Sequence, residues 1–198
     1  MNAKKIVTAG LALVMVAGIS VAGTLAYLTS SDSVQNTFTV GKVDITLDEA
    51  PVGTDGKEVE GDRVKANTYK LMPGHDYDKD PTVHFQAGSE ASYLFVKVDN
   101  GIADAESTEE GYKSIANQIT DNSWIPLTGE EGVYYQKVAA NTGDAAIDYL
   151  VFEGFTVSGD LTNDGLAAFN NKTVTVTAYA IQADGFNEAA DAWAELGA

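Results

Sequence analysis

The sequence predicts an all-β protein, a sandwich of two antiparallel sheets with a few short helices. About eight short segments alternate apolar and polar residues with the period of two that half-buried strands show. Turn signals rich in Gly, Asp and Asn separate these segments. The chain of 198 residues is 44% hydrophobic and 21% charged, which suits one domain with a core of its own.

Residues 1–26 have the three-part pattern of a secretory signal peptide. Two lysines precede an uncharged apolar stretch, and small residues stand at the −3 and −1 positions of a cleavage site between Ala26 and Tyr27. We expect this cleavage to leave residues 27–198 as a mature chain that is secreted to the extracellular matrix or cell surface, with no attachment to the membrane. A retained anchor stays the alternative, because about 20 apolar residues can span a bilayer.

Acidic residues dominate the charge. The chain has 29 Asp and Glu against 12 Lys and Arg, a formal net charge of −17, and loss of the two leader lysines would make the charge −19. This balance argues against nucleic acid and anionic membranes as partners, because both attract clustered basic residues. Any self-association should strengthen when salt or low pH screens the carboxylates. Cysteine is absent, which excludes disulfides and thiolate chemistry.

The first expected strand follows Asn36. Phe38 and Val40 occupy one parity, while Val43, Ile45 and Leu47 occupy the other. A β-bulge at residues 41–42 would return all five side chains to one face, so we predict one bent strand.

The middle of the chain alternates loops and strands. Residues 48–65 are acidic and glycine-rich, which predicts a loop or an exposed hairpin. Short strands are expected at 68–72 and 81–88, on either side of a Pro-Gly turn. The clearest strand spans residues 92–99 and places Leu94, Val96 and Val98 on one face and Tyr93, Phe95 and Lys97 on the other.

Further strands are expected at 124–127, 133–138, 149–157 and 172–182, with a parity switch at Gly154 in the third. The last of them places Val174, Val176, Ala178 and Ala180 on one face and threonines on the other. Short helices are expected within 107–120, where Ile115 and Ile119 are four apart, and within 161–169. A closing helix is expected behind Asn187 as N-cap, with Phe186, Ala190 and Trp193 at helical spacing.

The sequence predicts no catalytic, cofactor-binding or metal site, and we expect no enzyme. Asp76, Asp78 and Asp80 alternate as Ca²⁺ ligands can, but the following positions depart from an EF-hand loop, so a solvated acidic turn is the simpler interpretation. His75 and His84 are nine apart and lack the helical spacing of a zinc protease.

Aromatic and lysine side chains leave two further alternatives open. The two tryptophans and nine tyrosines could line a carbohydrate or protein groove, although such residues usually pack the core of a sandwich. Lys97 could form an isopeptide bond to a nearby Asn or Asp, although a solvent-facing lysine is the simpler interpretation.

Three stretches carry a family resemblance: GTLAYLTSSDSVQNTFTVGKVDITL, YKLMPGHDYDKDPTVHFQAGSEASYLFVKVD and VTVTAYAIQADGF. They resemble the TasA/camelysin family of Gram-positive bacteria, whose atypical signal peptides are removed by the dedicated peptidase SipW. Residues 100–165 match no pattern that we can name. The resemblance implies a jelly-roll fold and a structural role in the extracellular biofilm matrix.

Some members of the family assemble into fibres by giving the N-terminal segment of one subunit as a strand to the next. The resemblance implies that residues 27–40 are this donor strand, with Leu28, Val34, Phe38 and Val40 as its apolar side chains. Head-to-tail donation does not close on itself and therefore produces filaments. The expected partners are further copies of the chain and other matrix proteins.

Three alternatives to fibre formation remain. Residues 27–40 could be a tail followed by an ordinary first strand. The protein could be a surface metalloprotease of the camelysin kind, or an adhesin that does not polymerise.

Overall fold

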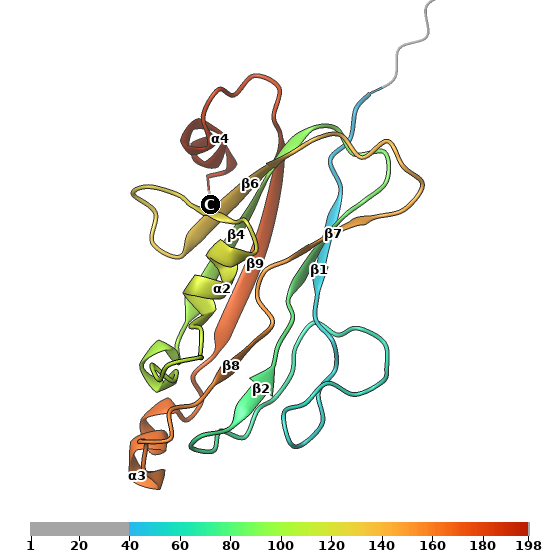
Figure 1. Cartoon of the computed structure of the whole chain (residues 1–198). Helices are drawn as coiled ribbons and strands as arrows, with labels where there is room; N and C mark the ends of the chain where they lie inside the picture. The colour runs from blue at the N-terminus through green and yellow to red at the C-terminus, as the bar shows by residue number, and fades with distance from the viewer. Residues whose placement is uncertain (1–39, 198) are drawn as a thin grey trace, which may run out of the picture. The chain divides into compact units, whose positions relative to one another are not determined.

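The structure, a computed structural model, describes residues 40–197, and its strands lie in antiparallel sheets (Figure 1). The expected signal peptide, its cleavage site at Ala26 and Tyr27, and the donor residues Leu28, Val34 and Phe38 lie outside the described residues. Among the helices of the described part, none is both long and apolar enough to cross a bilayer.

The first sheet has the strand order β1–β3–β7, formed by Ile45–Asp48, Thr82–Phe85 and Ile147–Leu150. Two shorter strands, β2 (Asp76–Asp78) and β8 (Gly154–Thr156), pair with each other. They continue β3 and β7, because the residue register is the same in both ladders. Hydrogen bonds from Lys79 N to Glu153 O (3.0 Å) and from Val151 N to Pro81 O (2.9 Å) bridge the interval.

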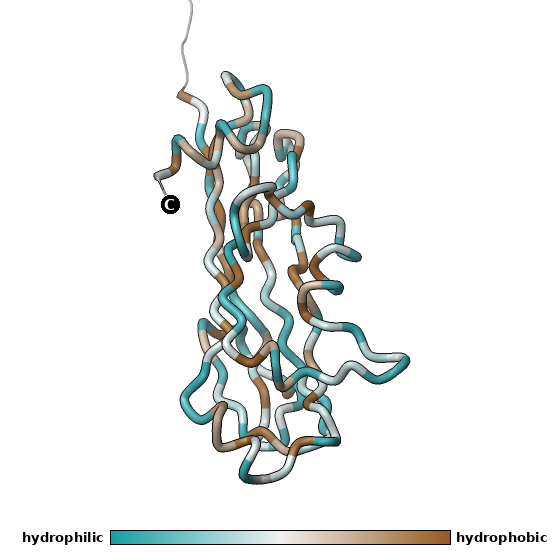
Figure 2. The backbone as a smooth tube through the Cα atoms, turned by 90° about the vertical axis from the view of Figure 1, so that its left-hand side faces the viewer, coloured by the Kyte–Doolittle hydropathy of each residue, from teal (hydrophilic) through white to brown (hydrophobic). Residues whose placement is uncertain are grey.

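The second sheet has the order β5–β6–β4–β9, formed by Ile125–Pro126, Val133–Val138, Ser92–Asn100 and Val174–Gln182. Its central strand β4 confirms the predicted parity: Leu94 and Val96 lie in the main core, and Tyr93 and Phe95 lie in a second cluster on the opposite face. Figure 2 shows hydrophobic and hydrophilic residues alternating along the strands.

The main core lies between the two sheets and contains Val83 and Phe85 of β3 together with Leu94 and Val96 of β4. Two aromatic rings extend it along the shorter ladder, where Tyr77 and Phe155 stack with centroids 4.9 Å apart. The prediction of an all-β protein with antiparallel sheets and a few short helices is therefore confirmed.

Short helices occupy the connections. They are η1 (Ala103–Ala105), α2 (Ile115–Asp121), α3 (Asn163–Leu166), η2 (Ala167–Phe169) and α4 (Ala189–Leu196). Ser114 caps α2 by accepting a hydrogen bond from Asn117 N, and the helix buries Ile115 and Ile119 as expected. Helix α4 covers the outer face of the second sheet, where the ring centroids of Trp193 and Phe95 lie 5.2 Å apart.

Two details of the predicted helices are wrong. The expected N-cap Asn187 is not used: the N-cap of α4 is Glu188, and no side chain there accepts a capping hydrogen bond. Ala190 is exposed, and the helix instead buries Ala189 and Ala192 beside Trp193, because the contact with the sheet selects that stripe.

The predicted strand at 68–72 is also wrong. The hydroxyl of Tyr77 accepts a hydrogen bond from Met72 N (2.7 Å) and donates one to Lys70 O (2.8 Å). Because a side chain satisfies these backbone groups, the segment needs no neighbouring strand.

The predicted bent strand is corrected at its start. Val40 is 97% exposed and does not share the face of Val43, Ile45 and Leu47, which are partly buried. Lys42 pairs with Ser89, beyond the end of β3, so Val40 lies past the paired part of β1.

Candidate functional site: the open edge at β9

Strand β9 pairs with β4 on one side. Two hydrogen bonds flank the ladder: Ala183 N donates to Ala91 O (2.7 Å), and Gly101 N donates to Thr173 O (2.9 Å). Their register shows that odd-numbered residues of β9 direct their backbone groups at β4. In an antiparallel pair the intervening residues direct theirs the other way. Outward-facing N–H and C=O groups therefore belong to Val174, Val176, Ala178, Ala180 and Gln182.

No described strand pairs with β9 on that outward side, which we call the β9 edge. The strand is nine residues long, and its sequence VTVTAYAIQ contains neither a charged residue nor a proline. Proteins usually protect edges with charges, prolines, bulges or short strands, because a bare edge pairs readily with another chain. The β9 edge has none of these devices along its length.

Apolar side chains lie directly beneath the β9 edge. Val174, Val176, Ala178 and Ala180 contact the main core but stay partly buried, whereas Leu94 and Val96 on the neighbouring strand β4 are 0% exposed. Strand β1 lies close to β9 without pairing to it, and its inward-facing Ile45 and Leu47 are also only partly buried. A further strand at β9 would cover apolar surface that this chain leaves accessible.

The edge formed by β7 and β8 is protected by the connection between β4 and β5. Trp124 Nε1 donates to Leu150 O (2.8 Å), and Gln118 Nε2 donates to Gly154 O (2.8 Å). Ser107 N donates to Thr156 O (2.8 Å). These bonds satisfy outward carbonyls along the edge, so little remains there for another strand.

The remaining two edges are also less open than β9. Glu49 and Val64 exchange backbone hydrogen bonds of 2.9 and 2.7 Å, and Lys65 Nζ donates to Leu47 O, which covers the end of β1. Strand β5 is only two residues long and includes Pro126. The β9 edge is thus the longest unprotected edge in residues 40–197.

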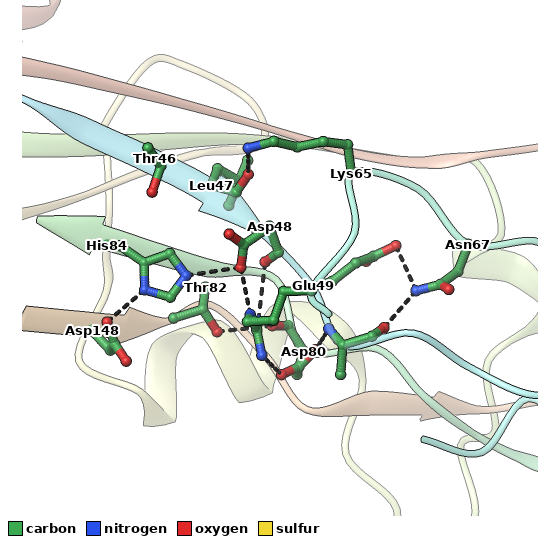
Figure 3. Close-up of polar contacts among 12 residues, drawn as sticks. Thr46, Leu47, Asp48, Glu49, Lys65, Asn67, Asp80, Thr82, His84 and Asp148 are labelled. Atoms are coloured by element: carbon green, nitrogen blue, oxygen red, sulfur yellow. Dashed lines mark hydrogen bonds and ion pairs between the residues drawn. The ribbon is translucent and has the colours of Figure 1, made fainter. Parts of the chain in front are cut away.

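A polar cluster lies on the first sheet (Figure 3). His84 of β3 contacts Asp48 of β1 through Nε2 (2.8 Å) and Asp148 of β7 through Nδ1 (2.5 Å). Partial burial lowers the pKa of His84, but hydrogen bonds to the two aspartates and their charges outweigh it, so the net pKa lies above 6.5. Arg63 also contacts Asp48. The cluster ties three strands together.

The two histidines do not form a common site. His84 has both ring nitrogens engaged, and His75 lies exposed just before β2, outside β3. Within residues 40–197, no group of three or more His, Cys, Asp or Glu side chains is arranged to hold a metal ion.

The three alternating aspartates also serve separate partners. Asp76 accepts from the Thr156 hydroxyl, and Asp78 accepts from Lys57 Nζ and Glu58 N. Asp80 accepts from Ala50 N and Arg63. Asp78 and Asp80 anchor the excursion at residues 49–67, whereas Asp76 contacts β8, so the three carboxylates do not converge on one point.

Both tryptophans are in the core, as the simpler interpretation predicted: Trp124 is 1% and Trp193 5% exposed. Lys97 is exposed on the outer face of β4. Sequence reasoning did not identify the β9 edge, although the nine-residue run without charge or proline was a visible signal for it.

Comparison of the chain with protein-family models, with curated proteins and with solved structures gave no match. The relation to the TasA/camelysin family therefore stays a prediction from the three sequence stretches.

Proposed function

We propose that the protein is a secreted structural subunit of an extracellular biofilm matrix, of the TasA/camelysin type with a jelly-roll fold. After cleavage behind Ala26, residues 27–40 of one copy add as a strand to the β9 edge of the next copy. Repetition of this contact produces a fibre, because a head-to-tail contact leaves a free donor at one end and a free edge at the other.

The observation that carries this proposal is the unprotected β9 edge above partly buried core side chains. A strand added there gains main-chain hydrogen bonds and covers apolar surface. The donor sequence suits this role because Leu28, Val34, Phe38 and Val40 share one parity and therefore point to the same face of an extended strand.

The metalloprotease alternative receives no support from the histidines, which are held apart and, for His84, fully engaged. The adhesin alternative differs in its dependence on the N-terminal segment: a monomeric adhesin binds its ligand without residues 27–40, whereas a fibre subunit does not assemble without them.

The test is electron microscopy of the mature protein collected from the medium of a secreting Gram-positive host, over a range of pH and salt. We expect filaments, favoured by low pH or added salt because these reduce repulsion between acidic copies. Deletion of residues 27–40 should leave a monodisperse monomer. Filaments from the deleted chain would overturn the proposal, and chelator-sensitive cleavage of casein would favour the protease.

A matched pair of variants separates strand insertion from a general effect of charge. Phe38→Asp places a carboxylate on the face that is expected to cover the partly buried core side chains beneath the β9 edge, whereas Thr39→Asp places the same charge on the opposite face. We expect Phe38→Asp to abolish filaments and Thr39→Asp to retain them. Equal behaviour of the two variants would contradict an inserted strand of this register.

A further inference from the structure

One carboxylate, directly after the end of β1, joins a lysine and an asparagine. Glu49 Oε2 accepts a hydrogen bond from Lys79 Nζ, and Glu49 Oε1 accepts one from Asn67 Nδ2 (3.0 Å). The side chains of Lys79 and Glu49 are only 11% and 6% exposed, and Asn67 is partly buried. An amine and a carboxamide are thus held on the two oxygens of the same buried acid. Figure 3 shows the contact between Glu49 and Asn67.

Backbone contacts fix the segments that carry the three side chains. Glu49 pairs with Val64 at the end of β1. Lys79 lies between β2 and β3, and its N–H donates to Glu153 O between β7 and β8. Asn67 is held at both ends of its amide, since Nδ2 also donates to Ala50 O (2.8 Å) and Oδ1 accepts from Val52 N (3.1 Å). The amide carbonyl is therefore polarised by a backbone N–H.

A tyrosine follows two residues after Asn67. Tyr69 is partly buried in the main core, and its hydroxyl donates to Asp78 O (2.9 Å). Burial, and then the negative charge of Glu49, raise the pKa of Tyr69 above its usual value.

We propose that Lys79 and Asn67 form an intramolecular isopeptide bond, with Glu49 as the catalytic acid and base. The nucleophile, the electrophile and the proton carrier lie in one cluster, so the reaction requires no cofactor and no external reactant.

The step balances within the cluster. Glu49 takes a proton from the Lys79 ammonium, which leaves a neutral amine and a carboxylic acid. The amine lone pair attacks Asn67 Cγ, and the developing oxyanion faces the Val52 N–H, as in other acyl transfers.

The intermediate then breaks the bond between Asn67 Cγ and Nδ2. Glu49 returns its proton to the departing nitrogen, removes one from the new amide nitrogen and passes this second proton to the released ammonia, so that it ends as a carboxylate. The products are a Lys79–Asn67 amide and one ammonium ion, and no atom is oxidised or reduced.

The position of this bond gives it a mechanical role. It would join the end of the excursion at residues 49–67 to the centre of the first sheet, in a chain that has no cysteine for a disulfide. Lys97, the lysine considered from the sequence, is exposed on the other sheet and is not part of such a cluster. This inference does not depend on fibre formation.

The test is mass spectrometry of the purified, folded full chain. We expect an intact mass lower than the sequence mass by one ammonia, and a digest in which trypsin does not cleave after Lys79 and residues 67 and 79 occur in one cross-linked peptide. A folded protein with the full sequence mass and normal cleavage after Lys79 would overturn the proposal.

Four variants assign the roles, with circular dichroism as the check of folding. Glu49→Gln and Lys79→Arg should each retain the full mass, because the first lacks the proton carrier and the second the nucleophile. Asn67→Asp should yield the same cross-linked product with loss of water in place of ammonia. Lys97→Arg is the matched control and should still lose ammonia; loss of the cross-link in this control alone would assign the bond to Lys97 and refute the cluster.

Discussion

Two adjacent positions on β9 allow a sharp test of the open edge. Thr177 is directly opposite Lys97, and the ladder assigns its N–H to β4. The N–H of Ala178 faces outward, away from β4. Proline removes a backbone N–H wherever it stands, so Thr177→Pro and Ala178→Pro remove donors from opposite sides of the same strand.

The two variants should differ in their free energy of unfolding. Thr177→Pro removes a ladder bond worth about 1 kcal/mol and leaves the Lys97 carbonyl unpaired at about 1–3 kcal/mol, so the free energy of unfolding should fall by about 2–4 kcal/mol. Ala178→Pro removes a donor that is solvated in the monomer, and the change should stay within about 1 kcal/mol. With a urea slope of about 2 kcal/mol per M, the midpoints should lie roughly 1 M apart.

Urea unfolding followed by tryptophan fluorescence measures this difference, since both Trp124 and Trp193 are buried. Electron microscopy of the same proteins gives the second reading: Ala178→Pro should keep its stability and lose filaments. If Ala178→Pro destabilised the chain as much as Thr177→Pro, the assigned register of β9 would be wrong. A stable Ala178→Pro variant that still forms filaments would refute β9 as the acceptor edge.

The His84 cluster and the close backbone approach at Gly154 give further expectations. The pKa of His84 is raised in the folded state, so its contribution to stability is full below 6.5 and is lost as the pH rises through the folded-state pKa. His84→Gln should therefore flatten the pH dependence of the urea midpoint across neutral pH, and an unchanged profile would contradict this. Gly154→Ala should cost about 1–3 kcal/mol, because a Cβ there would lie 2.2 Å from Tyr77 O. Gly159→Ala, whose Cβ would have no atom closer than 3.9 Å, is the control, and equal midpoints would refute the steric argument.

Strand parity was predictable because it is a local property. Successive side chains alternate along any extended segment, so the inward Leu94 and outward Tyr93 of β4 follow from the sequence alone. The spacing of Ile115 and Ile119 identified the buried face of α2 in the same way, although the helix begins only after its Ser114 cap. These elements depend on neighbours within a few residues.

The segment at 68–72 shows where local reasoning fails. It alternates as a strand does, but the hydroxyl of Tyr77 takes the backbone hydrogen bonds that a strand partner would make. Such a competing partner leaves no periodic signal in the segment itself.

The sequence by itself determined the all-β class, the parity of the main strands and the acidic, cysteine-free character of the chain. Only the tertiary structure decided that β9 lies at an edge, because this depends on which strands pair across long separations. The same holds for the cluster at Glu49. Asn67 lies 18 residues and Lys79 lies 30 residues further along the chain, and both contact the Glu49 carboxylate. The alternation of apolar and polar residues determines which side chains a segment can bury. The pairing of distant segments determines which backbone and side-chain groups remain available to react or to bind.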